Sequence, residues 1–210
     1  MSKQFNESKQ NIQMNHQQSL LSQTVDLLIN SRYPEMDRNT RKEFEALLRP
    51  QTVRKGEVFM NEGEYSKDLF VVGQGMIRQY YYKKGKDITE HFSYEGCLFL
   101  SIKSTLWGEP NHLFAEALED TILYRTSLAG FQEATKQHWG LNIFYRKVLE
   151  YSLVVSQEKA YEWRFNTAKE KYEILLKNHP EVVKRAPLFH IASYLNMTPE
   201  TLSRVRSSLL

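Results

Sequence analysis

The segment that most constrains the fold is the C-terminal stretch 189–210, whose pattern predicts two short helices joined by a tight turn. Five apolar side chains recur where a helix-turn-helix buries its inner faces: Ile191, Leu195, Met197, Leu202 and Val205. Ala192 is small, as the close crossing of two helices requires. We place Asn196 at the turn, because Asn is the non-glycine residue that best tolerates a left-handed conformation. A helical hairpin that only closes a core would show the same apolar pattern, and this alternative stays open.

The second of these helices carries its own start signals. Thr198 suits the N-cap position, Pro199 suits the first helical position, and Glu200 suits the positive end of the helix dipole. The face opposite the apolar residues is polar and can reach base edges or phosphates; it comprises Thr198, Glu200, Thr201, Ser203 and Arg204. The pattern therefore predicts a helix that lies in a groove of DNA.

Composition bounds the rest of the chain. With 210 residues, of which 41% are hydrophobic, two modest domains are expected. The N-terminus lacks an apolar signal core, and no stretch approaches the roughly 18 apolar residues of a membrane helix, so we expect a cytoplasmic protein. Cys97 is the single cysteine, which excludes an internal disulfide and a cysteine-ligated cluster. We interpret it as a small buried side chain.

The net charge of +3 is unevenly distributed along the chain. From Lys159 onward there are nine Lys or Arg residues against five Glu, a net +4, which leaves −1 for the first 158 residues. The positive excess therefore coincides with the predicted DNA-binding end, as contact with phosphates requires. A solvated basic face would give the same count.

The N-terminal third predicts helices. Residues 1–18 are rich in Gln, Asn, Ser and Lys, and we expect them to be disordered. Apolar residues from Ser19 onward predict one helix, and Arg41 to Leu48 a second; Pro34 separates them and Pro50 ends the second.

Glycines become frequent in the next segment, from Val53 to about Tyr124. Seven of the nine glycines lie between Gly56 and Gly108, and the runs between them are short and β-prone. The expected strands are 58–60, 69–72, 76–82, 88–92 and 121–124. Short strands at this spacing predict an antiparallel sandwich or barrel.

Two motifs then carry a family resemblance. The run from Lys55 to Arg78 resembles the opening of a cyclic-nucleotide-binding β-roll, through Gly56, Glu57, Glu62, Gly63, Leu69, Phe70, Gly75 and Arg78. Together with the terminal Thr198–Arg204 motif, the chain resembles a transcription regulator of the Crp/Fnr family over residues 40–210. The resemblance implies an α+β fold: a jelly-roll-like antiparallel β-roll, a long dimerisation helix and a C-terminal, winged-helix-like helix-turn-helix domain.

The effector site is where the chain departs from cyclic-AMP-binding relatives. In the positions that the resemblance assigns to the effector pocket stand Gly96, Cys97, Leu98, Leu113 and Phe114. Cys97 replaces the acidic residue that would hold the ribose, and Leu113 replaces the phosphate-binding Arg. Burying a phosphate without a paired cation is costly, so we predict that cyclic AMP is not a ligand. A less charged effector, or none, stays open.

A long helix is predicted from Leu141 to Phe165. Leu141, Phe144, Val148, Tyr151 and Val155 recur at intervals of three and four, a pattern typical of a coiled-coil seam, although a single chain could bury the same stripe against its own roll. The resemblance favours a homodimer, because a two-fold dimer reads two half-sites of a palindrome. We divide the chain into the N-terminal segment 1–18, the roll with flanking helices 19–140, the dimerisation helix 141–165 and the DNA-binding domain 166–210.

Within the last domain a helix is expected over 168–177, after a hinge at Asn166, and the link 179–188 leaves little room for a β-hairpin wing. By the resemblance, Glu200 and Arg204 contact bases, whereas Thr198, Thr201, Ser203 and Arg206 contact phosphates. Pro199 belongs to the same DNA-binding set. Double-stranded DNA, RNA polymerase and a small-molecule effector are the implied partners.

No catalytic or metal-binding constellation stands out. The six histidines show no ligand spacing, and the chain has no nucleophile elbow, Walker loop or His-Glu-x-x-His motif. We expect no enzyme activity and no cofactor. The remaining alternative is a small-molecule sensor whose terminal helices dock a protein partner rather than DNA.

Overall fold

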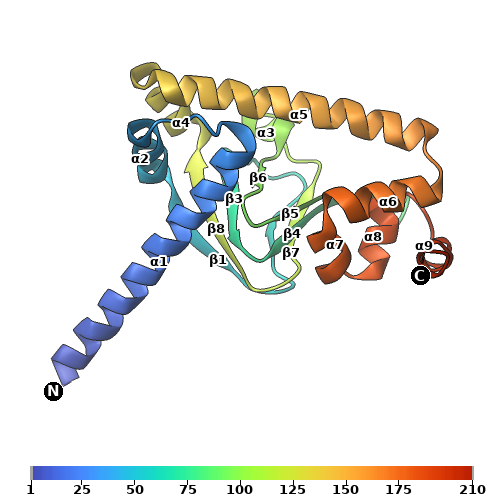
Figure 1. Ribbon diagram of the computed structural model, residues 1–210, viewed down its shortest axis with the longest axis horizontal. Helices are drawn as coiled ribbons and strands as arrows, with labels where there is room; N and C mark the ends of the chain where they lie inside the picture. Colours follow the sequence, from blue (N-terminus) through green and yellow to red (C-terminus); the bar gives the residue numbers. More distant parts are fainter. Residues whose placement is uncertain (1, 210) are drawn as a thin grey trace.

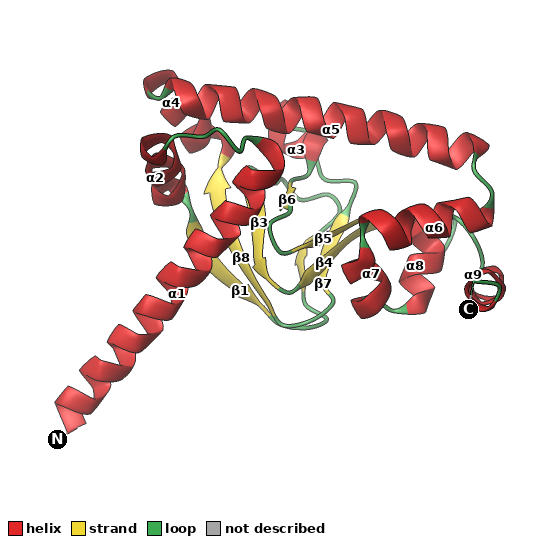
Figure 2. Ribbon diagram, in the orientation of Figure 1, coloured by secondary structure: helices red, strands yellow, loops and turns green. Residues whose placement is uncertain are grey.

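The computed structural model describes the backbone of residues 2–209 and the side chains of residues 17–209. Helices α1 (Ser2–Arg32) and α2 (Arg38–Leu47) precede a roll of two sheets, and α4 (Leu128–Gln137) and the long α5 (Trp139–Phe165) follow it. Figures 1 and 2 show α5 running across the top of the roll to the C-terminal helices. The helix that the sequence predicted from Ser19 begins at Ser2, within the segment 1–18 for which disorder was expected.

Two four-stranded antiparallel sheets form the roll. The first has the order β1 (Arg49–Val53), β8 (Thr121–Ser127), β3 (Asp68–Gln74), β6 (Leu98–Phe99). The second has the order β2 (Val58–Met60), β7 (Phe114–Ala117), β4 (Met76–Lys83), β5 (Lys86–Tyr94), and the short helix α3 (Ile102–Trp107) lies between β6 and β7. All five expected strands are present. The sequence did not reveal β1, β6 or β7, and Pro50 lies in β1 at the edge of its sheet, where a missing N–H is tolerated.

Strand β3 is buried on both faces. Phe70 and Val72 point into the roll, and the ring of Phe70 stacks on Phe99 with centroids 5.2 Å apart. Leu69 and Val71 point outward into a second core that is shared with the helices. Burial on both sides explains why the strand reads as a continuous apolar run rather than an alternation.

The second core fastens α5 to the roll, and it corrects the predicted dimerisation seam. Leu141, Phe144 and Val148 are 0%, 0% and 9% exposed inside the chain, and Phe144 packs edge-on against Phe44 of α2 at 4.9 Å. These three residues therefore cannot face a partner. Of the predicted seam, Tyr151 is 41% exposed and Val155 is half-buried. The apolar stripe was identified correctly, but its first half packs on the roll.

Four helices complete the chain: α6 (Ala168–Asn178), α7 (Pro180–Arg185), α8 (Leu188–Tyr194) and α9 (Pro199–Ser207). They share a third core with Met76, Phe92 and Tyr94 of the roll, so the C-terminal helices pack directly on β4 and β5 (Figure 2). The link 179–188 folds as α7, and no strand occurs in the described residues from 166 to 209. None of the helices in the described part of the chain is long and apolar enough to cross a membrane.

Candidate nucleic-acid interface and effector pocket

Local sequence determines how α9 is built. Asn196 has φ of 54°, the left-handed conformation expected at the turn between α8 and α9. The hydroxyl of Thr198 accepts a hydrogen bond from the Thr201 N–H at 3.2 Å, and Pro199 occupies the first turn. Leu202 is fully buried in the core of the C-terminal helices. The N-terminal end of α9 is therefore capped and fixed. The face of α9 opposite Leu202 is free to contact a ligand.

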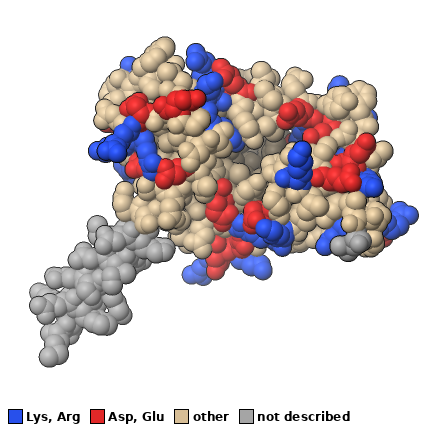
Figure 3. All heavy atoms as spheres, in the orientation of Figure 1, with Lys and Arg blue, Asp and Glu red and all other residues tan. Residues whose placement is uncertain are grey.

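The structure brings the predicted DNA-binding residues together on that face. Thr198, Glu200, Ser203, Arg204 and Arg206 are exposed, whereas Pro199 and Thr201 are half-buried. Arg204 donates to the Thr201 hydroxyl at 3.4 Å, which extends the guanidinium along the helix surface. Figure 3 shows Lys and Arg side chains at the end of the molecule where α9 lies.

Glu200 keeps its charge in this setting. Its own backbone N–H and the Thr198 hydroxyl hydrogen-bond to the carboxylate, and they lower its pKa. An ionised carboxylate at the start of α9 can accept hydrogen bonds only, which suits the exocyclic amine of cytosine. The Arg204 guanidinium, one turn later, offers the complementary donor pair for guanine.

Helix α8, the partner of α9, is joined to strand β5 through Ser193. The Ser193 hydroxyl donates to the Asp87 carbonyl at 3.0 Å and accepts from the Thr89 N–H at 3.0 Å. β5 is an edge strand, since it pairs only with β4, and the hydroxyl satisfies backbone groups that the missing neighbour leaves unpaired. The orientation of the helix-turn-helix is thus tied to the roll.

Ionic contacts add to this junction between the roll and the C-terminal helices. Arg185 of α7 forms a bidentate pair with Glu95, at 2.7 and 3.0 Å, and also bonds Glu119. The Arg185 guanidinium opposes the burial of Glu95 and holds the pKa of that carboxyl below its ordinary value. Tyr94 and His179 share a hydrogen bond at 3.0 Å, and burial lowers the pKa of His179. Charge and polarity at this junction therefore fix the C-terminal helices relative to the roll.

The structure brings two of the five effector-pocket candidates into one cavity. Gly96 has φ of 78° and lies against Leu27 of α1, so it serves a close packing contact. Leu113 is 5% exposed within the roll, and Phe114 stacks on Tyr80 at 5.2 Å. Among the described residues, Cys97 and Leu98 line a cavity in common, and the grouping of Gly96, Leu113 and Phe114 with them stays a prediction.

That shared cavity, about 200 Å³ in volume, lies between β5, β6, α5 and the C-terminal helices. Besides Cys97 and Leu98 it is lined by polar groups that the sequence reasoning missed, which include Arg32, Gln79, His91, Tyr151 and His179. Arg32 stacks its guanidinium on the Tyr151 ring at 3.3 Å. Burial raises the pKa of the Cys97 thiol, so this half-buried cysteine stays protonated. The lining comes from separate elements, and no spacing in the sequence could have grouped it.

Arg78, part of the motif that carried the resemblance, has a structural role. It is 3% exposed and bonds Asp87 at 2.6 and 3.0 Å and Glu116 at 2.9 Å, while its guanidinium lies 3.9 Å from the Tyr80 ring. Burial opposes its charge, but the two carboxylates raise its pKa above the ordinary value. Arg78 thereby links β4, β5 and β7.

Comparisons with known proteins agree with this architecture. Residues 50–138 match the family model of the cyclic nucleotide-binding domain. FixK2 from Bradyrhizobium japonicum is similar in structure, with a TM-score of 0.62 and 23% identity over 77% of this chain and 84% of that one. A CooA mutant from Carboxydothermus hydrogenoformans has a TM-score of 0.57 and 20% identity over 78% of this chain and 77% of that one. The Thermus thermophilus catabolite activator protein has a TM-score of 0.53 and 18% identity over 87% of this chain and 86% of that one. No match was found among the curated proteins.

The fold therefore defines a β-roll of the cyclic nucleotide-binding type that is joined by a long helix to a helix-turn-helix. Residues 50–138 match the cyclic nucleotide-binding domain that the first motif predicted, and over the rest of the chain the similarity to these structures is one of fold.

Proposed function

We propose that this protein is a sequence-specific DNA-binding transcription regulator. The observation that carries the proposal is the geometry of α9: Leu202 is fully buried, the N-terminal end is capped by Thr198, and Glu200 and Arg204 project from the exposed face. A recognition helix needs such an anchored inner face and a polar outer face. The similarity of fold to an activator protein supports the same function.

The regulator acts as a homodimer through the exposed face of α5. Val154, Tyr161 and Phe165 are 54%, 62% and 67% exposed and lie seven and four residues apart, so they share one side of the helix. Rows of large apolar side chains on one exposed helix mark an interface, and a two-fold axis there would present two copies of α9 to a palindrome.

Cyclic AMP is not the effector in this proposal. Buried Leu113 and half-buried Phe114, which stacks on Tyr80, stand where relatives would place the phosphate ligands, and the cavity near Cys97 contains Arg32 already stacked on Tyr151. Titration calorimetry with cyclic AMP should show no binding, and micromolar binding would contradict this part of the proposal. We assign no catalytic residues, and RNA polymerase remains a proposed partner.

Two substitutions on α9 test the DNA reading. Arg204→Ala should weaken binding to the specific site by about 1–3 kcal/mol and leave binding to random DNA nearly unchanged. Arg206→Ala should weaken binding to both kinds of DNA alike and reduce the slope of log affinity against log salt by about one. Fluorescence anisotropy at several salt concentrations measures both effects. If Arg204→Ala weakened random DNA as much as the specific site, the base-reading role would be wrong.

The second candidate is a sensor whose terminal helices dock a protein. Exposed Phe189 beside α9, at 54%, favours it, because an aromatic side chain can anchor a protein interface. Ionic strength separates the two: DNA affinity falls steeply with salt, whereas an apolar protein interface is nearly insensitive.

A further inference from the structure

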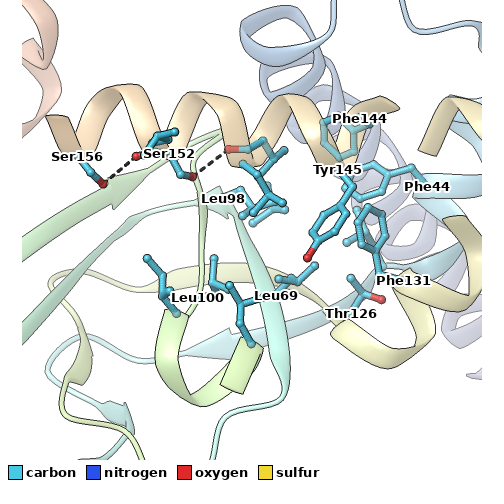
Figure 4. A pocket seen from close by; sticks show the side chains of 17 residues that line it. Phe44, Leu69, Leu98, Leu100, Thr126, Phe131, Phe144, Tyr145, Ser152 and Ser156 are labelled. Atoms are coloured by element: carbon cyan, nitrogen blue, oxygen red, sulfur yellow. Dashed lines mark hydrogen bonds between the residues drawn. The ribbon is translucent and has the colours of Figure 1, made fainter. Parts of the chain in front are cut away.

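A second cavity, of about 230 Å³, lies between α5 and the outer face of the first sheet (Figure 4). Its inner wall is deeply buried: Val71, Phe131 and Phe144 are 1%, 2% and 0% exposed. In the described part of the chain, no Lys, Arg, His, Asp or Glu is among the residues that line it. The cavity adjoins the one near Cys97, with Leu98 in the wall between them, but its chemistry is different.

Such a cavity favours an apolar occupant over water. A buried water molecule needs two to four polar partners, and this lining is almost wholly hydrocarbon. An engineered apolar cavity of roughly 150 Å³ stays dry and binds benzene, and the present one is larger. Wall atoms that face an empty space also lose dispersion contacts, which a ligand of matching shape restores.

Four side-chain hydroxyls line the cavity, and two of them lack a partner within residues 17–209. The hydroxyls of Ser152 and Ser156 donate to carbonyls of their own helix at 2.9 and 2.8 Å. Tyr145 and Thr126 have no such side-chain hydrogen bond among the described residues. Figure 4 shows the Tyr145 ring reaching from α5 into the cavity. A ligand with a single polar group can therefore satisfy one of these hydroxyls.

The mouth of the cavity is also apolar. Ile102 of α3 and Leu153 of α5 line it and are 51% and 64% exposed. An uncharged molecule could pass between these two helices without meeting an ion pair. A cyclic nucleotide is excluded from this cavity, because its phosphate would be buried with no cation.

We propose that this cavity binds an uncharged apolar molecule of the size of an alkyl-substituted benzene, with at most one hydrogen-bonding group placed at Tyr145 or Thr126. Residues 144–156 of α5 form one wall, so the ligand holds α5 against the roll. Because α5 leads to the C-terminal helices, the ligand would also affect DNA binding; that consequence rests on the proposed function, whereas the binding of the ligand does not.

Binding is tested on the full chain without DNA, by titration calorimetry with 4-propylphenol and its near-isostere 4-propyltoluene. Both probes should bind the wild-type protein. Tyr145→Phe should weaken 4-propylphenol several-fold and leave 4-propyltoluene unchanged, because only the former meets the hydroxyl. A merely structural role for Tyr145 would change both affinities equally.

A cavity-filling variant supplies the second arm. Leu106→Phe, on the α3 wall, should weaken both probes at least tenfold without lowering the melting temperature, since the added atoms enter empty space. Leu47→Phe, in α2 at the edge of the same core but outside the cavity wall, is the matched control and should retain binding. Absence of binding by both probes at millimolar concentration, or undiminished binding by Leu106→Phe, would overturn the proposal. Loss of probe binding as the protein concentration rises would show that a second copy of the chain occupies the mouth, and the proposal would be wrong.

Discussion

The Ser193 hydroxyl makes the junction between helix-turn-helix and roll directly testable. In Ser193→Ala the Thr89 N–H loses its 3.0 Å acceptor and the Asp87 carbonyl loses its 3.0 Å donor. Thr89 is 1% exposed, so its N–H is left without solvent contact. An orphaned buried donor costs about 1–3 kcal/mol, and a water molecule that entered the vacated space would bring the cost to the lower end.

Hydrogen exchange of the Thr89 amide measures this cost at the site itself. Because about 1.4 kcal/mol corresponds to tenfold, the Thr89 amide of Ser193→Ala should exchange roughly 5- to 150-fold faster than in the wild type. Ser207→Ala is the control, since that hydroxyl is exposed and bonds only the Ser203 carbonyl of its own helix. Its effect should stay within about 0.5 kcal/mol. Equal exchange of the Thr89 amide in both variants would refute the inference that Ser193 joins α8 to β5.

Three further predictions concern packing, backbone and pH. A Cβ on Gly140 would lie 2.7 Å from Thr40 Cγ2 and 2.9 Å from Thr40 Cβ, so Gly140→Ala should cost about 1–3 kcal/mol in urea unfolding, and Thr40→Ala in the same chain, which removes the first contact but not the second, should recover part of it; additive costs would contradict the contact. Asn196→Ala should lower stability by about 1 kcal/mol, whereas Asn196→Gly should not, because only a residue tolerant of φ 54° fits there; equal losses would point to a role for the amide instead. Burial lowers the pKa of His179, so its stabilising neutral form is retained above about pH 6.5 and stability falls as the pH decreases below that value. Unfolding at pH 7 and pH 5.5 should show a smaller loss for His179→Gln, which can still bond Tyr94, and an unchanged loss would assign the effect to other groups.

Local signals predicted the helix-turn-helix well because each depends on a few consecutive residues. The turn at Asn196, the cap at Thr198 and the buried Leu202 all follow from backbone preferences and a short apolar period. The four glycine-bounded strands between Gly56 and Gly96 were predictable for the same reason. β6, with two residues, and β7, with four, form only because longer strands lie beside them.

Assignments that depend on which surfaces meet were less predictable. Helix α5 carries one apolar stripe through Phe144 and Val148 and another through Val154 and Tyr161, and periodicity does not say which one the roll buries. The residues that line both cavities come from strands and helices far apart in the chain, so their spacing in the sequence does not predict that they lie together. Leu113 stands where the resemblance places a phosphate-binding Arg, and its side chain lies in the packed roll rather than in a pocket.

The central claim is that α9 reads DNA as one half of a two-fold pair. The most direct measurement is a selection of bound sequences from random double-stranded DNA by the purified full chain, followed by sequencing. The account predicts an enriched palindrome whose half-sites lie one helical turn apart, about 10 base pairs centre to centre, and loss of its base preference at the position read by Arg204 in Arg204→Ala. No enriched sequence, with or without 4-propylphenol, would contradict it.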